Sequence, residues 1–355
     1  MTSLRDRILK TSTLEYTDVL SDSTVYNEKD VTSTPIPALN IAYSGKITGG
    51  FASGLTIFAG PSKHFKTLFC LISAASYLKK HPDAIVIFYD SEFGSPVEYF
   101  TAAGISADRV VHSPITNIEE LRHDLANQLK EIKRGEKIAI VIDSLGNLAS
   151  AKEIKDAEDG SEKADMTRAK VIKSMFRIVT PHLRLKDIPM FVVAHTYDTM
   201  EMYSKKVVSG GTGQYYSADN IYIVGRQQDK DGTELAGYNF ILNVEKSRYV
   251  KEKSKIPINV LYGSGVQKWS GLLDIALEGQ YIGKINKQKL GLVDRETGVV
   301  LEDQSWKRED LENNGPFWKK FIEDTDFPDY VFKSYAAASG QLITEDAAPE
   351  AEEGE

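Results

Sequence analysis

The feature that most constrains the fold is a strand-like run joined to a helix-like run by a short loop. Residues 55–59 are mostly apolar, the loop 60–67 follows at once, and residues 66–80 have the apolar spacing of a helix. A loop that ends at a helix start directs backbone N–H groups and the positive end of the helix dipole at one place. The segment therefore predicts a phosphate-binding site.

The loop matches the phosphate-binding pattern G-x-x-x-x-G-K-[ST] at Gly60, Lys66 and Thr67. Phe65 stands where the pattern has its second glycine, so the loop needs a geometry that tolerates a side chain there. In this pattern the lysine reaches the β- and γ-phosphates and the hydroxyl binds Mg²⁺. A chance match is the alternative. The other nucleotide-binding residues expected in the loop are Pro61, Ser62, Lys63 and His64.

Two more strand-like runs end in carboxylates. Residues 138–142 are followed by Asp143, and residues 85–89 are followed by Asp90 and Glu92. The carboxyl ends of parallel strands meet at the edge where ligands bind, so these acids are expected beside the loop. We expect Asp143 to hold Mg²⁺ together with the loop threonine, and Glu92 to activate the water that attacks the γ-phosphate. Asp90 lies nearer its strand, and a structural role is expected for it.

Strand-length apolar runs alternate with helical stretches between about residues 40 and 265. This alternation predicts an α/β fold with a mostly parallel twisted sheet flanked by helices. The expected strands are residues 55–59, 85–89, 110–112, 138–142, 190–194 and 221–224, with a late pair at 239–245 and 255–262. The expected helices are residues 66–80, 117–134 and 164–180.

Composition excludes several classes of protein. The single cysteine, Cys70, rules out an intrachain disulfide and a cysteine-rich zinc site. No apolar run approaches the roughly 18 residues that a membrane span needs, so no membrane partner is expected. The net charge of −8 includes six acids within residues 345–355. The rest of the chain is therefore near neutral, and a nucleic acid partner is not excluded.

Four regions follow from these patterns. Residues 1–34 begin with a short amphipathic helix, expected either to pack on the chain's own core or to dock on a neighbouring subunit. Residues 35–268 form the predicted core. Residues 269–343 hold all three tryptophans and are expected to form a small C-terminal subdomain. Residues 344–355 are acidic and lack core-forming side chains, so a disordered tail is predicted there.

Several segments resemble the RecA-type strand-exchange recombinases, and within them most closely the phage UvsX recombinases. The most specific mark is the phosphate loop with its phenylalanine. The other segments with this resemblance are residues 88–94, 142–148, 166–170, 210–213 and 244–248. The resemblance extends from near the N-terminus to about residue 306. It implies a RecA-like ATPase core that uses ATP and Mg²⁺, preceded by a polymerisation arm at residues 1–34.

The resemblance also implies roles for single residues. Tyr99 would stack on adenine, and His195 stands where bacterial RecA has a glutamine that senses the γ-phosphate. Lys246 and Arg248 would reach the ATP of a neighbouring subunit as cations supplied in trans. Without the resemblance, the histidine would be a satisfied strand-end side chain and the basic pair a plain surface feature. The expected catalytic residues are Glu92, Lys66, Lys246, Arg248 and His195.

Two polar segments, residues 145–165 and 196–213, resemble the DNA-binding loops of this family. Basic side chains there can neutralise phosphates, apolar ones can stack on bases, and glycines allow close approach of the backbone. The expected DNA contacts are Arg168, Met202, Tyr203, Lys205, Lys206, Gly210, Gly211, Thr212 and Gly213. The first segment is also rich in acids, so a solvated loop is the alternative there.

These features predict an ATP-dependent DNA recombinase of a phage, active in the bacterial host cytoplasm in recombination, repair and recombination-dependent replication. It would form head-to-tail helical filaments on single-stranded DNA and exchange strands with homologous double-stranded DNA. A recombination mediator and a single-strand-binding protein are further partners that the resemblance implies. The alternatives are a ring-forming helicase motor and a RecA-fold regulatory protein, which would share the nucleotide-binding residues.

Overall fold

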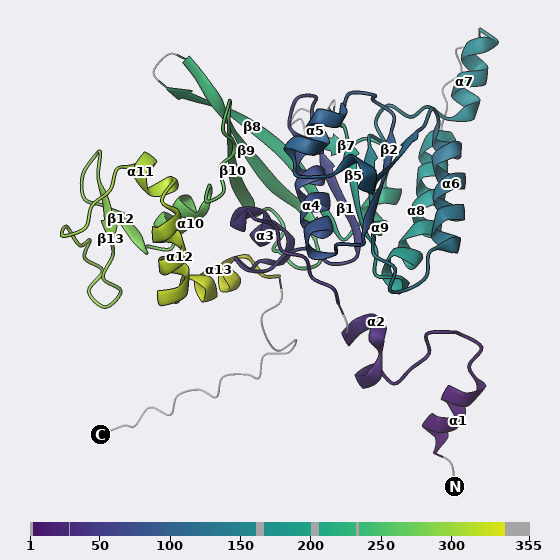
Figure 1. The fold of residues 1–355 in the computed structure, drawn as a ribbon, viewed down its shortest axis with the longest axis horizontal. Coiled ribbons are helices and arrows are strands. Elements are labelled where there is room, and N and C mark those ends of the chain that lie inside the picture. The colour runs from purple at the N-terminus through teal and green to yellow at the C-terminus, as the bar shows by residue number, and fades with distance from the viewer. Residues whose placement is uncertain (1–2, 28, 161–166, 200–205, 232–233, 338–355) are drawn as a thin grey trace, which may run out of the picture.

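The computed structural model describes residues 3–27, 29–160, 167–199, 206–231 and 234–337 (Figure 1). Its central sheet has nine strands. Their bounds are β1 (Gly54–Ala59), β2 (Ile85–Asp90), β3 (Val110–Pro114), β4 (Ile138–Asp143), β5 (Pro189–Ala194), β8 (Asn220–Asp231), β9 (Glu234–Ser247), β10 (Lys255–Leu261) and β11 (Gly265–Val266).

The strand order is β11-β10-β9-β8-β1-β5-β4-β2-β3. Neighbouring strands from β8 to β3 pair in parallel. The strands β9, β10 and β11 extend the sheet through antiparallel pairings. The predicted α/β fold with a mostly parallel sheet is therefore confirmed.

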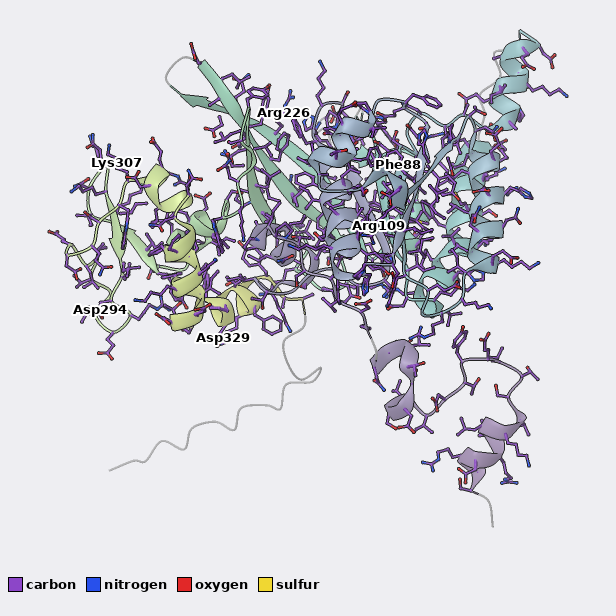
Figure 2. All side chains as sticks on the ribbon, viewed as in Figure 1. Phe88, Arg109, Arg226, Asp294, Lys307 and Asp329 are labelled. Carbon is purple, nitrogen blue, oxygen red and sulfur yellow. The ribbon has the colours of Figure 1, made fainter. Side chains whose placement is uncertain are left out.

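Helices cover both faces of the sheet because its central strands are apolar on both faces. Phe58 and Phe88 belong to the cluster that packs under α3 (Pro37–Ser44) and α4 (Lys66–Lys80). Figure 2 shows Phe88 within this densely packed region. Ile57, the residue before Phe58 in β1, points to the opposite face of the sheet. It belongs to the second cluster, under α6 (Ile118–Glu131) and α8 (Thr167–Leu185).

The strands β8 and β9 form a long antiparallel ribbon that projects beyond the helices (Figure 1). The sequence predicted only the buried part of each strand. Residues 225–231 are mostly polar and lack an apolar alternation. Cross-strand hydrogen bonds hold this part of the ribbon, and a hydrophobic pattern does not report such bonds.

Two segments that the sequence assigned to loops contain further elements. The segment 145–165 includes α7 (Ala151–Glu158), which begins with a capping box formed by Ser150 and Glu153. This helix has no buried residue, and five of its eight residues are charged, so the sequence was interpreted as a polar loop. The segment 196–213 begins with a small hairpin of β6 (Thr196–Asp198) and β7 (Lys206–Val208).

The N-terminal segment begins apart from the core and reaches it at Thr24, whose carbonyl accepts a hydrogen bond from Arg134 Nη2 at 2.8 Å (Figure 1). It contains α1 (Leu4–Thr11), the short turn η1 (Leu20–Asp22) and α2 (Thr24–Asn27), in which no residue is buried. The predicted first helix is therefore present. No helix among the described residues is long and apolar enough to cross a membrane.

The C-terminal segment is a group of short helices beside a two-stranded hairpin (Figure 1). Trp318 is fully buried in it, and its indole N–H donates to the Leu311 carbonyl at 2.9 Å. The elements are α10 (Leu272–Glu278), β12 (Ile282–Lys284), β13 (Leu290–Leu292), α11 (Arg308–Glu312), α12 (Gly315–Asp324) and α13 (Phe327–Tyr335). The limits predicted for the four regions stay predictions, and residues 344–355 lie outside the described residues.

Candidate functional site

The phosphate loop joins β1 to α4 at the carboxyl edge of the sheet. Lys63 and Phe65 adopt positive φ angles of 61° and 51°, in the left-handed region that favours glycine. The Phe65 ring lies 4.9 Å from the Phe240 ring of β9, measured between centroids. This packing offsets the backbone strain, about 1–2 kcal/mol for a non-glycine residue. It explains how phenylalanine takes the place of the expected glycine.

Lys66 lies in the first turn of α4 and folds back over the loop. Its Nζ donates to the Pro61 carbonyl at 2.8 Å, and the residue is only 6% exposed. Burial lowers the pKa of Lys66, while Glu92 and Asp143 act in the opposite direction. A buried ammonium group that contacts a neutral carbonyl gains strongly from an anionic partner such as phosphate.

Thr67 and Asp143 meet where β4 ends. The Thr67 hydroxyl donates to Asp143 Oδ2 at 2.8 Å. Asp143 Oδ1 is buried and has no hydrogen-bond partner among the residues that the structure describes. Burial raises the pKa of Asp143 to about 6, and the Thr67 hydrogen bond opposes this. A buried carboxylate oxygen without a partner, next to a hydroxyl, fits a hard divalent cation such as Mg²⁺.

Glu92 follows β2 and lies beside Ser144 and His195. Its Oε1 accepts from the Ser144 hydroxyl at 2.6 Å and contacts His195 Nε2 at 3.2 Å. The His195 contact is the main cause that lowers the pKa of Glu92 to about 2; burial opposes it and Ser144 adds to it. The carboxylate is therefore ionised at neutral pH and can accept a hydrogen bond that orients a water molecule, although the lowered pKa makes it a weaker base than an ordinary glutamate. Asp90 instead accepts the backbone N–H groups of Glu92 and Phe93 at 3.0 and 2.7 Å.

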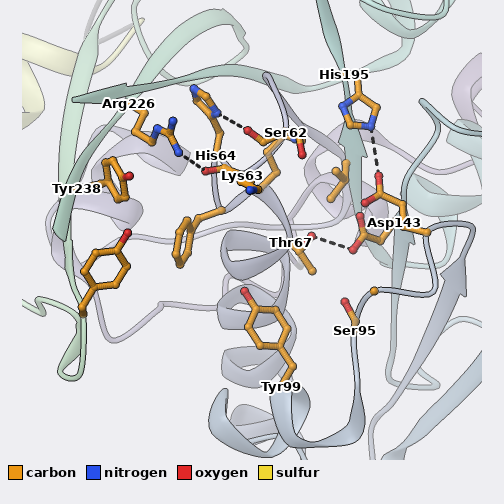
Figure 3. Close-up of a pocket in the computed structure, with 16 residues that line it drawn as sticks. Ser62, Lys63, His64, Thr67, Ser95, Tyr99, Asp143, His195, Arg226 and Tyr238 are labelled. Atoms are coloured by element: carbon orange, nitrogen blue, oxygen red, sulfur yellow. Dashed lines mark hydrogen bonds and ion pairs between the residues drawn. The ribbon is translucent and has the colours of Figure 1, made fainter. Parts of the chain in front are cut away.

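A cavity of about 480 Å³ opens above these groups (Figure 3). It brings together the predicted phosphate loop, the Thr67–Asp143 pair and the Glu92–His195 contact. Tyr99 of α5 (Val97–Ala102) lines the same cavity. Its volume lies in the range of ligand sites of small molecules. Gly60 and Pro61 precede its lining residues in the loop. The lining residues are Ser62, Lys63, His64, Phe65, Lys66, Thr67, Glu92, Gly94, Ser95, Tyr99, Asp143, Val193, His195, Arg226, Tyr238 and Tyr262.

The sequence did not predict Gly94, Ser95, Val193, Arg226, Tyr238 and Tyr262 as site residues; the last three come from the β8–β10 part of the chain. Arg226 lies on β8, Tyr238 on β9, and Tyr262 directly after β10. They are at least 150 residues from the phosphate loop in the chain, and only the sheet pairing brings them to it. The available signal was weak, because Arg226 and the two tyrosines belong to no motif that points to the phosphate loop.

Comparisons with known proteins show the family of this chain. Residues 269–331 match the family model described as the C-terminal domain of the bacteriophage T4 recombination and repair protein. The chain is 49% identical to the recombination and repair protein of Enterobacteria phage T4 over 341 residues, which cover 94% of this chain and 86% of that protein. The chain belongs to the UvsX family of recombination and repair proteins.

The UvsX family is related in turn to bacterial RecA. This chain is 27% identical to protein RecA of Acholeplasma laidlawii over 286 residues, which cover 78% of this chain and 83% of that protein. The resemblance inferred from the phosphate loop and the strand ends is thus confirmed, and with it the recombinase role of the family. The helicase and regulatory alternatives gain no support from these relatives.

The first predicted DNA-binding segment, residues 145–165, follows β4. Arg168, at the start of α8, donates to the carbonyls of Leu148 and Leu145, each at 2.6 Å. Its guanidinium therefore holds the chain that leaves β4. A direct contact between Arg168 and DNA stays a prediction.

The second predicted segment follows β5 and His195. Lys206 begins β7 and is exposed. Gly210 and Gly211 have φ angles of 105° and 81°, which other residues adopt only with strain. Thr212 precedes α9 (Gly213–Ser217), and a Cβ on Gly213 would lie 2.6 Å from the Lys173 Cβ. Met202, Tyr203 and Lys205 lie outside the described residues.

Lys246 and Arg248 lie away from the cavity of their own subunit. The Lys246 ammonium donates to the Tyr215 carbonyl in α9, which precedes β8. Arg248 Nε lies 2.6 Å from Asp219 Oδ1, next to the amino end of β8. The phosphate loop follows the carboxyl end of β1, which runs parallel to β8. Lys246 and Arg248 therefore lie at the opposite end of these strands from the phosphate loop of the same chain.

Replacing Gly146 with alanine tests the contact between His195 and Glu92. A Cβ at Gly146 would lie 1.9 Å from His195 Cδ2, so the imidazole must move. We expect the kcat of ATP hydrolysis to fall roughly 10- to 100-fold, because Glu92 loses the partner that orients it. The Gly146→Ala protein should still unfold in one cooperative transition, which would show that the variant is folded.

Gly225→Ala is a matched control for this variant, since its added Cβ would meet the nearest side-chain atom at an ordinary 3.4 Å. Steady-state hydrolysis with single-stranded DNA measures the effect. Normal turnover in Gly146→Ala would show that His195 is not needed to orient Glu92.

Proposed function

We propose that this chain is a DNA-dependent ATPase that assembles head to tail on single-stranded DNA and exchanges it with a homologous strand of duplex DNA. The observation that supports this most is the single cavity that joins the phosphate loop, the Thr67–Asp143 pair and the Glu92–His195 contact. In a chain of the UvsX family, such a set fits hydrolysis of ATP with Mg²⁺.

Each of these groups has a distinct part in the proposed hydrolysis. Lys66 binds the terminal phosphates, and Thr67 and Asp143 hold Mg²⁺. When bound, the cation neutralises charge on the phosphate oxygens. Glu92 orients and activates the attacking water. His195 follows β5 and precedes the β6–β7 hairpin, so a change at Glu92 on hydrolysis reaches the second predicted DNA segment directly.

Assembly into a filament is supported by the N-terminal segment. Leu4 and Ile8 of α1 are 65% and 56% exposed and lie apart from the core (Figure 1). An amphipathic helix that none of the described residues covers favours docking on a neighbouring subunit over packing on its own core. One patch that docks on a different patch of the next copy gives an open helix rather than a closed ring.

The basic pair at the opposite end of β8 supports the same assembly. Lys246 and Arg248 are remote from their own phosphate loop, so they are proposed to complete the ATP site of the neighbour. Single- and double-stranded DNA are the proposed nucleic acid partners. A recombination mediator and a single-strand-binding protein are proposed as accessory partners from the family resemblance.

A joint-molecule assay tests the proposed function. The protein, ATP, Mg²⁺ and a labelled single strand are mixed with a supercoiled duplex that is homologous or not. We expect product only with the homologous duplex and none with Lys66→Ala. Strong hydrolysis stimulated by single-stranded DNA without any joint molecule, even with a mediator added, would instead favour a helicase-type motor.

A further inference from the structure

The β8–β9 ribbon contacts the phosphate loop at both of its positions with strained backbone. Phe65 packs against Phe240 of β9. The Lys63 carbonyl accepts a hydrogen bond from Arg226 Nη1 of β8 at 3.1 Å. The Arg226 guanidinium lies over the Tyr238 ring, with Cζ 4.5 Å from its centroid. Figure 3 shows Arg226 between Tyr238 and Lys63 at one side of the cavity.

These contacts form one continuous support. Arg226 and Phe240 are direct partners across the β8–β9 pairing, and Tyr238 lies two residues before Phe240. The Tyr262 ring packs edge-on against Tyr238 at 5.9 Å between centroids. The planar group of Arg226 is thus held on one face by an aromatic ring and on one edge by the Lys63 carbonyl.

The loop needs such support because it lacks glycine where the backbone is left-handed. A non-glycine residue with positive φ pays a conformational cost and persists only when its surroundings hold it. The ring contact of Phe65 holds one position. At Lys63, whose φ is 61°, the hydrogen bond from Arg226 is the contact that holds the peptide.

We propose that Arg226 is a positioning residue that holds the phosphate loop in its nucleotide-binding geometry, with Tyr238 as its stacking surface. The inference rests on the proposed function, namely that this cavity binds ATP. By fixing the Lys63 peptide before nucleotide arrives, Arg226 keeps the loop N–H groups directed at one point. Arg226 therefore acts on nucleotide affinity, because less ordering remains to be done on binding.

The chemistry distinguishes this role from simple attraction of phosphate by a positive charge. A guanidinium can stack on a ring and donate in its plane at the same time, whereas the ammonium of lysine cannot do both. Arg226→Lys preserves the charge and should fail. Tyr238→Phe preserves the ring face and should retain function, since the contact needs only the ring.

The test measures binding of a fluorescent ADP with Mg²⁺ and ATP hydrolysis on the full-length protein. For Arg226→Gln and Arg226→Lys we expect the dissociation constant and the KM for ATP to rise about 5- to 20-fold, with kcat within about twofold of wild type. Tyr238→Phe should bind within about twofold of wild type. Wild-type affinity in Arg226→Lys would overturn the proposal.

Hydrogen exchange of the nucleotide-free protein provides a second readout. In Arg226→Gln, amides of residues 60–67 should exchange faster, while those of β4 should keep their protection. Equal loss of protection in β4 would assign Arg226 to overall stability and overturn the proposal. If wild type binds nucleotide and Arg226→Gln binds it equally well, only this inference fails. If wild type binds no nucleotide, the proposed function fails and the inference with it.

Discussion

Replacing Lys66 with alanine is expected to reduce kcat/KM for ATP hydrolysis by about 10³-fold or more, because the variant loses the cation that faces the transferred phosphate. Lys66 is 6% exposed and contacts only a carbonyl among the hydrogen-bond partners found in the described residues. Hydrolysis with saturating single-stranded DNA, followed by phosphate release, measures the loss.

The same substitution should not destabilise the protein. Burial lowers the pKa of Lys66, so its charge costs free energy in the folded state at neutral pH. The thermal midpoint of Lys66→Ala is therefore expected to be unchanged or higher. Lys79→Ala is the matched control, since Lys79 lies exposed in the last turn of the same helix. Near-normal hydrolysis in Lys66→Ala would place the nucleotide elsewhere.

The parts of this site that local patterns encode were predicted well. Apolar spacing predicted a helix over residues 66–80, where the structure has α4. The acids after two buried strands were predicted to meet the loop, because parallel strands end at one edge. Asp143 and Glu92 do line the same cavity as Lys66 and Thr67.

The parts that depend on distant contacts were not predicted. The sequence marked Phe65 as a departure from the glycine pattern, but it did not identify Phe240 as the side chain that packs on it. Arg226 donates to a carbonyl 163 residues earlier in the chain, and no local spacing reports such a contact. The exposed helix α7 has a capping signal, but most of its residues are charged, so the segment was assigned to a polar loop.

Charged residues show a further limit of the sequence. Arg168 was assigned to DNA, yet its guanidinium donates to carbonyls of its own chain. Arg248 was assigned to a neighbour's ATP, and here it pairs with Asp219. A basic side chain has several good partners, and the sequence alone does not rank them.

Replacing both Lys246 and Arg248 with alanine is expected to reduce ATP hydrolysis by about 10³-fold, because each ATP site would lose the cations of its neighbour. The folded monomer should persist. Asp219 keeps its ion pair with Arg184, and its Oδ2 still accepts the Leu55 backbone N–H at 2.9 Å. Circular dichroism and steady-state hydrolysis on single-stranded DNA measure the two effects separately.

Mixing this double variant with Lys66→Ala decides whether the pair acts across an interface. Lys66→Ala subunits have intact cations and a defective loop, and the double variant has the reverse. In a head-to-tail assembly of equal parts, about one interface in four joins an intact loop to intact cations, so activity should recover to at most about a quarter of wild type. If the pair acted within its own subunit, each chain of the mixture would still contain a defect. The mixture would then show no more than the summed residual activities of the two variants, and the pair would have to be assigned a structural role in its own chain.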